Sequence, residues 1–275
     1  PRSASRDIRR GHQMTATAVA DTAAVDPHRY LVLGTVTLAT MLFAMTVTIS
    51  YVVLPQMQGS LSATQDQIAW SVTFNLVATA VATPATGWLT NRFGRRAVLL
   101  WCVTGFSAAS LLAGTATNLE SLIAYRVVQG LVGAPIVPAS QAIILNRFPR
   151  NQHGLATAIW GIGVVLGPVV GPTLGGFVAE EYNWRWVFFM TLPVCALSIL
   201  GVWLFITDRQ RNTGMRLDWT GFLTLAVAIA AFQLMIDRGE REDWFASIEI
   251  IVEASLAAIA LYIFIVHSLT AAKPF

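Results

Sequence analysis

The sequence predicts an all-α membrane protein, a polytopic helical bundle that crosses the bilayer about eight times. Hydrophobic residues make up 55% of the chain and charged residues only 12%, whereas charged residues reach about 25% in soluble domains. The apolar residues form long blocks of the length, about 20 residues, that a helix needs to cross the hydrocarbon core. Because these blocks are too long for the strands of a membrane barrel, helices are the predicted spanning elements.

Eight apolar segments are the expected spans. They run near 29–54, 67–89, 97–116, 119–145, 153–178, 184–206, 217–236 and 247–268. Thr64 and Gln67 have the spacing of a capping box ahead of the second span, and Ser247 can cap the eighth. Residues 1–27 are expected to form a disordered cytoplasmic tail. Its first residues lack the apolar core of a signal peptide, and Met14 is a candidate for the true start.

Arginines alternate between the predicted loops. They follow spans two, four and six, as Arg92, Arg95, Arg96, Arg147, Arg150, Arg209, Arg211 and Arg216, whereas the other loops are mainly acidic or mixed. The positive-inside rule then places the basic loops and both termini in the cytoplasm. A nucleic-acid-binding patch is the rival interpretation of these arginines, and the regular alternation argues against it.

The segment after span two reads Gly-Trp-Leu-Thr-Asn-Arg-Phe-Gly-Arg-Arg, over residues 87–96. It is predicted to be a tight basic turn with a glycine at each end. It resembles the signature loop of the major facilitator superfamily, Gly-x-Leu-x-Asp-Arg-x-Gly-Arg-Arg, except that Asn91 replaces the acidic residue. The resemblance gives conformational roles to Gly87, Arg92, Gly94, Arg95 and Arg96. A merely basic anchoring loop is the alternative.

Span four carries a charged residue, Arg126, within its apolar stretch. Such a residue costs about 2.5–3.5 kcal/mol on insertion scales, so it should face the interior of the bundle. On an ideal helix it shares a face with Gln129, Gly130, Gly133, Ser140 and Gln141. The segment resembles the fourth-helix motif of the same superfamily, Arg-x-x-Gln-Gly, whose arginine is implicated in proton coupling. The alternative is that Arg126 extends to the outer boundary of the membrane.

Span five carries glycines four residues apart, which predicts a bare ribbon on one helix face. Two prolines, Pro168 and Pro172, are expected to bend this span. The stretch resembles the antiporter motif of the superfamily, Gly-Pro-x-x-Gly-Pro-x-x-Gly-Gly, and a glycine zipper without transport meaning is the alternative. The glycines concerned are Gly163, Gly167, Gly171, Gly175 and Gly176.

Two further spans follow the first six, as in the fourteen-helix drug:proton antiporters of the EmrB/QacA type. The resemblance divides the chain into a six-helix bundle, 28–207, and two accessory helices, 208–275. It also implies that this chain is the N-terminal part of a transporter whose second six-helix half is missing, since the substrate path of such transporters lies between two halves.

Acidic residues are missing from the interiors of spans one to six. In span one, Thr46 and Tyr51 stand where the resembled branch has aspartate and asparagine. A proton-coupled exchanger needs a group that titrates in the working range, usually a buried carboxylate. Glu253 in the eighth span is a candidate, and the alternatives are that it only faces a partner helix, or that the acid lies in the second half.

The resemblance implies efflux of hydrophobic or cationic drugs from the cytoplasm across the inner (plasma) membrane, in exchange for protons. The expected path is lined by Thr46, Ser50, Asn75, Arg126 and Gln129. The expected partners are the lipid bilayer, the substrates and protons, with a periplasmic adaptor protein and an outer-membrane channel as further candidates and no nucleic acid.

No cofactor beyond the proton gradient is expected. Cys102 and Cys195 are read as small buried hydrophobes and the histidines lack ligand spacing, so no metal site is predicted. An enzyme is not expected, because no catalytic set or nucleotide loop appears. Two other functions stay open: transport of a specific metabolite or siderophore, and a non-transporting membrane scaffold subunit.

Overall fold

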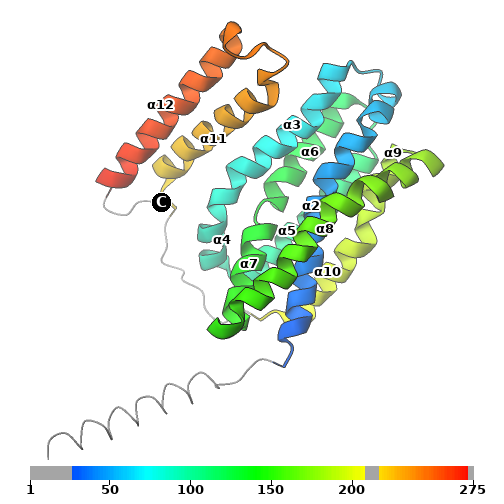
Figure 1. The fold of residues 1–275 in the computed structure, drawn as a ribbon, viewed down its shortest axis with the longest axis vertical. Helices are drawn as coiled ribbons and strands as arrows, with labels where there is room; N and C mark the ends of the chain where they lie inside the picture. The colour runs from blue at the N-terminus through cyan, green and yellow to red at the C-terminus, as the bar shows by residue number, and fades with distance from the viewer. Residues whose placement is uncertain (1–26, 208–216, 272–275) are drawn as a thin grey trace, which may run out of the picture.

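The structure is a computed structural model that describes residues 27–207 and 217–271. Residues 1–26 of the expected tail, with the candidate start Met14, lie outside the described residues, as do Arg209, Arg211 and Arg216. The remaining chain forms a bundle of long helices that run side by side (Figure 1).

Within the described ranges, eight helical segments are long and apolar enough to cross a membrane. The predicted fold class is therefore confirmed, and the segment ends differ from the expected ones by a few residues. The segments are Arg29–Ser60, Gln65–Phe93, Arg95–Gly114, Leu119–Arg147, Arg150–Glu181, Trp184–Phe205, Trp219–Gly239 and Ile248–Thr270.

Four of these segments contain more than one helix. The second consists of α3 (Gln65–Ala82), a 3-10 turn (Thr83–Ala85) and α4 (Thr86–Phe93). The fourth consists of α6 (Leu119–Gly133) and α7 (Ile136–Arg147), and the sixth of α9 (Trp184–Phe189) and α10 (Thr191–Phe205). The fifth begins with a 3-10 turn (Arg150–Gln152) before α8 (His153–Glu181). Pro84 and Pro135 lie at the first two interruptions, where proline removes a helix hydrogen bond.

Helix α2 (Arg29–Ser60) lies at the centre of the six-helix bundle. It packs along α8, and it also contacts α3, α7 and α10. The helix α5 (Arg95–Gly114) packs against α6 and α10. The last two helices, α11 (Trp219–Gly239) and α12 (Ile248–Thr270), form a hairpin that stands beside α3, and α11 makes the contact (Figure 1).

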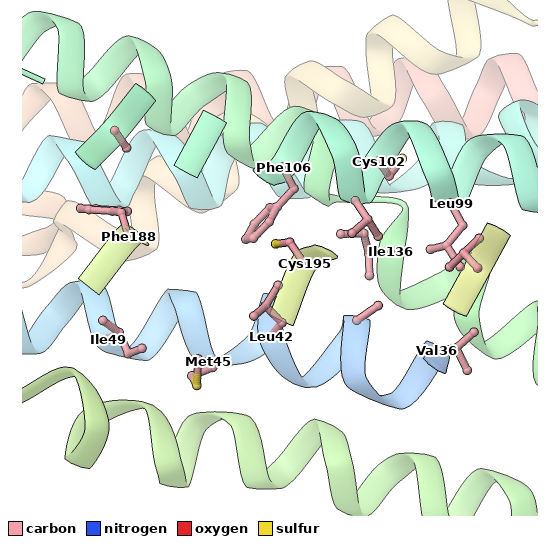
Figure 2. Close-up of a cluster of buried hydrophobic side chains, with 14 of the residues drawn as sticks. Val36, Leu42, Met45, Ile49, Leu99, Cys102, Phe106, Ile136, Phe188 and Cys195 are labelled. Atoms are coloured by element: carbon pink, nitrogen blue, oxygen red, sulfur yellow. The ribbon is translucent and has the colours of Figure 1, made fainter. Parts of the chain in front are cut away.

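The buried apolar core lies where α2, α5, α7, α9 and α10 meet. Figure 2 shows Leu42 of α2 facing Cys195 and Phe106, with Ile49 and Phe188 together at one end of the cluster. Cys102 and Cys195 are 7% and 0% exposed, so both occupy positions of small buried hydrophobes, as predicted. Because lipid is as apolar as these side chains, close packing and not water exclusion holds the helices together.

The two predicted helix caps have different outcomes. At the start of α3, the Thr64 hydroxyl accepts from the Gln67 amide at 3.2 Å, and the Gln67 side chain accepts from the Thr64 amide at 2.9 Å. This capping box is confirmed. Ser247 does stand at the N-cap position of α12, but its side chain makes no capping hydrogen bond. The prediction that its hydroxyl caps the helix is therefore wrong.

The basic segment after span two is mostly helical, and the expectation of a turn with a glycine at each end is wrong. Gly87 lies within α4, and a Cβ added to it would meet nothing within 4 Å. The chain reverses at Gly94 alone, with φ 92° and ψ 148°. Residues with a Cβ rarely adopt this conformation, so Gly94 is the glycine that the turn requires.

Candidate functional site

Arg126 lies inside the bundle, about two turns from the start of α6, and its side chain is 0% exposed. Its two terminal nitrogens donate to the Ser50 hydroxyl of α2 and to the Gln129 side-chain oxygen. Its guanidinium carbon lies 5.5 Å from the centre of the Phe188 ring of α9. The alternative that Arg126 extends to the membrane boundary is therefore wrong.

The Arg126 contacts extend into a network that joins four long helices. Gln129 donates to the Ser110 hydroxyl of α5 at 2.6 Å. Asn75 of α3 donates to the Arg126 backbone oxygen at 2.7 Å. All of these polar side chains are buried, with exposures of 0–6%. A buried polar network with well-made bonds fixes the relative positions of its helices, because each lost partner leaves a costly unsatisfied group.

Span one contributes neutral hydroxyls to this site. Thr46 donates to the Leu42 carbonyl at 2.9 Å, and Ser50 donates to the Thr46 carbonyl at 2.7 Å. Ser50 therefore holds its own proton toward its helix and offers a lone pair to Arg126. Among the described residues, the polar partners of the Arg126 side chain are uncharged, and its Nε atom has no hydrogen-bond partner. The site thus carries a buried positive charge that its own hydrogen bonds do not neutralise.

The polar stripe predicted around Arg126 is buried at four of its five other positions. Gln129, Gly130, Gly133 and Ser140 are all buried. Gln141 is exposed, so its assignment to the inner face is wrong. On an ideal helix it lies about 60° from Arg126, at the edge of the stripe, and the interruption between α6 and α7 separates the two residues.

The two small glycines of α6 allow close helix contacts. A Cβ on Gly130 would collide with the Asn75 backbone oxygen of α3, and one on Gly133 would lie 2.7 Å from the Phe43 ring of α2. These contacts bring α2 and α3 near enough to α6 for Ser50 and Asn75 to reach Arg126. The glycines therefore serve the network although they take no part in its hydrogen bonds.

The glycine ribbon of α8 lies against α2 along its whole length. Gly163, Gly167, Gly171 and Gly175 are buried, and a Cβ on each would approach Thr37, Met41, Thr48 and Ile49 of α2. Gly176 lies at the margin of this contact, 3.7 Å from Val52 by the same measure. The helix continues through Pro168 and Pro172. The ribbon allows the two backbones to approach closely, as small residues do between membrane helices.

At the end of the bundle that carries the arginine-rich loops, arginine side chains donate hydrogen bonds to backbone carbonyl groups of neighbouring segments. Arg96 donates to the Trp203 oxygen near the end of α10 at 2.7 Å, and Arg147 donates to the Thr207 oxygen at 3.2 Å. Arg95 approaches the Ala142 oxygen at 3.4 Å, and Arg92 lies 5.9 Å from the Trp88 ring. Cations are favoured at the carboxyl ends of helices, where unpaired carbonyls gather.

Glu253 lies away from the Arg126 network, on α12 of the accessory hairpin. Its carboxylate binds Arg238 of α11 at 3.0 Å, and its side chain is 15% exposed. The structure therefore does not bring this sequence-predicted pathway residue together with Thr46, Ser50 or Arg126. Among the described residues, no group of three His, Cys, Asp or Glu side chains is placed to hold a metal ion.

Sequence reasoning missed two members of the site. Ser110 lies on α5, and no motif distinguishes it from the other serines of that helix. Phe188 of α9 is 2% exposed, whereas Trp186 in the same helix is 50% exposed. Trp186 and Phe188 are two positions apart, so they lie on different faces of α9. Helical periodicity could have predicted this difference from the sequence.

A bundle of apolar helices around a buried polar network defines a multi-pass membrane protein. The sequence profile of the Major Facilitator Superfamily matches residues 36–273. The chain belongs to that superfamily, as the resemblance of its motifs predicted.

The chain is similar to named export proteins of this superfamily. It is 36% identical over 238 residues to the multidrug export protein EmrB of Escherichia coli (strain K12), covering 86% of this chain and 46% of that protein. It is 37% identical over 233 residues to the fatty acid resistance protein FarB of Neisseria gonorrhoeae, covering 84% and 46%. The chain therefore spans about half the length of the curated relatives that it matches.

Solved structures support the fold. A peptide transporter POT in complex with sulfate superposes with a TM-score of 0.65 at 14% identity, covering 88% of this chain and 53% of that one. A D-xylose-proton symporter gives 0.60 at 12% identity, covering 84% and 66%. At such low identity the likeness concerns the arrangement of the helices.

Proposed function

We propose that this chain forms the N-terminal helices of a drug exporter that expels hydrophobic or cationic compounds in exchange for protons. The observation that carries the proposal is the Arg126 network, a fully buried cation held by neutral side chains of α2 and α6. A buried arginine with uncharged partners costs stability, so its place inside the bundle argues for a role in transport. The similarity to proteins named for multidrug export supports the direction and the class of substrate.

The side chains around this network combine small polar and apolar groups, a composition that suits substrates of mixed polarity. Thr46, Ser50 and Asn75 present small polar groups among apolar neighbours. Binding sites of this kind, with a few polar groups in an apolar lining, orient a ligand without demanding one shape. The proton gradient is the proposed energy source.

The proposed membrane is the inner (plasma) membrane, with the arginine-rich ends of the helices on the cytoplasmic side. A periplasmic adaptor protein and an outer-membrane channel belong to the proposal as partners in a host with two membranes. Reporter fusions at the two ends of α2 would test the orientation, and copurification from such a host would test the partners.

A second candidate is transport of a specific class of metabolite, namely export of amphipathic carboxylates. It is favoured by the relative named for fatty acid resistance. The positive charge of Arg126, whose bonds go to neutral oxygens, would match a carboxylate head group. Competition between a lipophilic cation and a long-chain fatty acid in one transport assay would separate the two candidates.

The first experiment measures proton-driven efflux of a lipophilic cation dye in inverted membrane vesicles. It compares this chain with a chimaera that joins it to the second half of EmrB. Transport by the chimaera and its loss in Arg126→Ala would support the proposal. The matched control is Arg185→Ala, which changes an arginine of α9 that donates to the Ala116 oxygen at 2.7 Å. If the chimaera reaches the membrane yet moves neither dye nor protons, the scaffold alternative is favoured instead.

A further inference from the structure

Phe188 of α9 contacts the charged centre of the Arg126 network with the face of its ring. The guanidinium carbon of Arg126 lies over this ring, 5.5 Å from its centre. The two side chains are 0% and 2% exposed. The face of an aromatic ring carries a negative potential, and it attracts a cation within about 6 Å, most strongly where water is absent. The Phe188 ring therefore favours the charge of Arg126.

The hydrogen-bond partners of the guanidinium are neutral. Ser50 and Gln129 accept its bonds, and within residues 27–207 and 217–271 the Nε atom has no hydrogen-bond partner. A buried cation is costly unless the groups around it favour its charge. The ring face of Phe188 meets this need at a site where the hydrogen bonds bring no carboxylate.

The position of the Phe188 ring is fixed by its own helix. Trp184, one turn earlier in α9, meets it edge to face, with ring centres 6.1 Å apart and planes at 86°. Trp184 is itself 1% exposed. The Asn183 side chain caps the start of α9, and the Thr191 hydroxyl donates to the Phe188 carbonyl at 2.6 Å. The ring is thus held in place by contacts that do not involve the guanidinium.

The ring also joins a fifth helix to the Arg126 network. The hydrogen bonds of the network link α2, α3, α5 and α6, and α9 packs against α2 and α5. A hydrogen bond requires a donor and an acceptor in one alignment, whereas a ring face attracts a cation as a whole. The guanidinium can therefore exchange its hydrogen-bond partners while it stays over the ring.

We propose that Phe188 is a positioning residue for Arg126. Its ring favours the buried charge and keeps the guanidinium in place while the hydrogen-bond partners of Arg126 change during transport. The part of this inference that concerns transport rests on the proposed export function. The electron density of the ring, and not only its volume, then controls the stability of the site and the rate of transport.

The test replaces Phe188 in the 275-residue chain by phenylalanines that carry one, two or three ring fluorines. Fluorine withdraws electrons from the ring face and changes its shape little, so the attraction for Arg126 should fall stepwise. Unfolding by sodium dodecyl sulfate in mixed micelles gives the folding equilibrium constant of each form. We expect three fluorines to lower this constant about threefold to tenfold, as the loss of a buried cation–π contact should.

Each form is also made together with Arg126→Met, which removes the charge and keeps a long, unbranched side chain. Fluorination should then have little effect, because changes in packing occur in both backgrounds and cancel in the comparison. The matched control position is Phe106 of α5, which is also 2% exposed and lies 5.9 Å from the Phe43 ring. The effect of fluorine at Phe106 should not depend on Arg126.

A second measurement reports the contact without Arg126→Met, should that variant fail to fold. In the chain with labelled arginine in lipid nanodiscs, the guanidinium protons of Arg126 should resonate upfield of those of the exposed arginines, because they lie over an aromatic ring. Phe188→Leu keeps a buried apolar side chain and should remove this shift. An Arg126 signal that is the same with phenylalanine and with leucine would refute the contact.

The transport test uses the chimaera in the vesicle assay, with kcat and KM of dye efflux measured at equal amounts of protein in the membrane. We expect kcat to fall stepwise with the number of fluorines at Phe188, about threefold to tenfold for three. KM should stay nearly unchanged, because the buried ring positions Arg126 and does not contact the substrate. A role limited to packing would lower the amount of folded protein and leave kcat unchanged.

The contrary results have separate meanings. Equal effects of fluorine with arginine and with methionine at position 126 would overturn the contact between ring and charge. A clear dependence on Arg126 in unfolding, with kcat unchanged, would make the contact structural only and refute the positioning role. If the chimaera with an unmodified Phe188 moves neither dye nor protons, the export proposal fails together with the role in transport, whereas the unfolding experiment still decides whether the contact exists.

Discussion

Gly167 of α8 lies directly against the Met41 carbonyl of α2. A Cβ added to this glycine would stand 2.5 Å from that oxygen and 3.1 Å from the Met45 backbone nitrogen. Both contacts involve backbone atoms, which cannot rotate away as a side chain can. The separation of the two helices is therefore set at this position by the absence of a side chain, and the same face continues through Gly171 and Gly175.

Gly167→Ala should destabilise the protein by about 1–3 kcal/mol, the usual cost of overpacking. The matched control is Gly161→Ala in the same helix, where a Cβ meets nothing within 4 Å. That change should leave stability unchanged or raise it by about 0.5–1 kcal/mol, since alanine is the better helix former. Unfolding by sodium dodecyl sulfate in mixed micelles would measure both, and equal effects would refute the close contact.

Gly94→Ala should cost about 1–3 kcal/mol, because φ 92° with ψ 148° is a strained conformation for any residue with a Cβ. Gly87→Ala, in the same motif, should be nearly neutral because it adds a methyl group in open space within a helix. Thermal unfolding midpoints in detergent would compare the two. A larger loss for Gly87→Ala would contradict the assignment of the turn to Gly94.

Ser110→Ala and Ser140→Ala should have opposite effects, although both serines are 0% exposed. The Ser110 hydroxyl accepts from Gln129, so its removal leaves a buried amide unsatisfied and should cost about 1–3 kcal/mol. The Ser140 hydroxyl has no hydrogen-bond partner within residues 27–207 and 217–271, so its removal should be neutral or stabilising by about 1 kcal/mol. The same micelle titration distinguishes these outcomes, and a similar loss in both variants would argue against the Gln129–Ser110 bond.

Thr64→Ala should weaken the start of α3 by about 0.5–2 kcal/mol, because the hydroxyl caps the Gln67 amide. Ser247→Ala should change little at the start of α12, since the Ser247 side chain makes no capping bond. Hydrogen exchange followed by mass spectrometry reports each helix end separately. Faster exchange at α12 in Ser247→Ala would show a cap that the structure lacks.

The spans could be predicted from the sequence because a membrane helix is defined by local composition. The glycine face of α8 and the inward position of Arg126 also followed from the chain alone, since a repeat of about four residues and the cost of a charge in lipid are local properties. The sequence misplaced Gln141 and the turn near Gly87, because helix interruptions shift faces and end points in ways that composition does not record.

The sequence by itself determined the class of protein, the number of spans and the residues that must avoid lipid. Only the tertiary structure decided which partners those residues find. The bonds from Arg126 to Ser50 and from Thr73 to Asp237 join positions 76 and 164 residues apart. Such pairs depend on how helices pack in three dimensions, and small residues such as Gly130 and Gly167 set that packing by the contacts they permit.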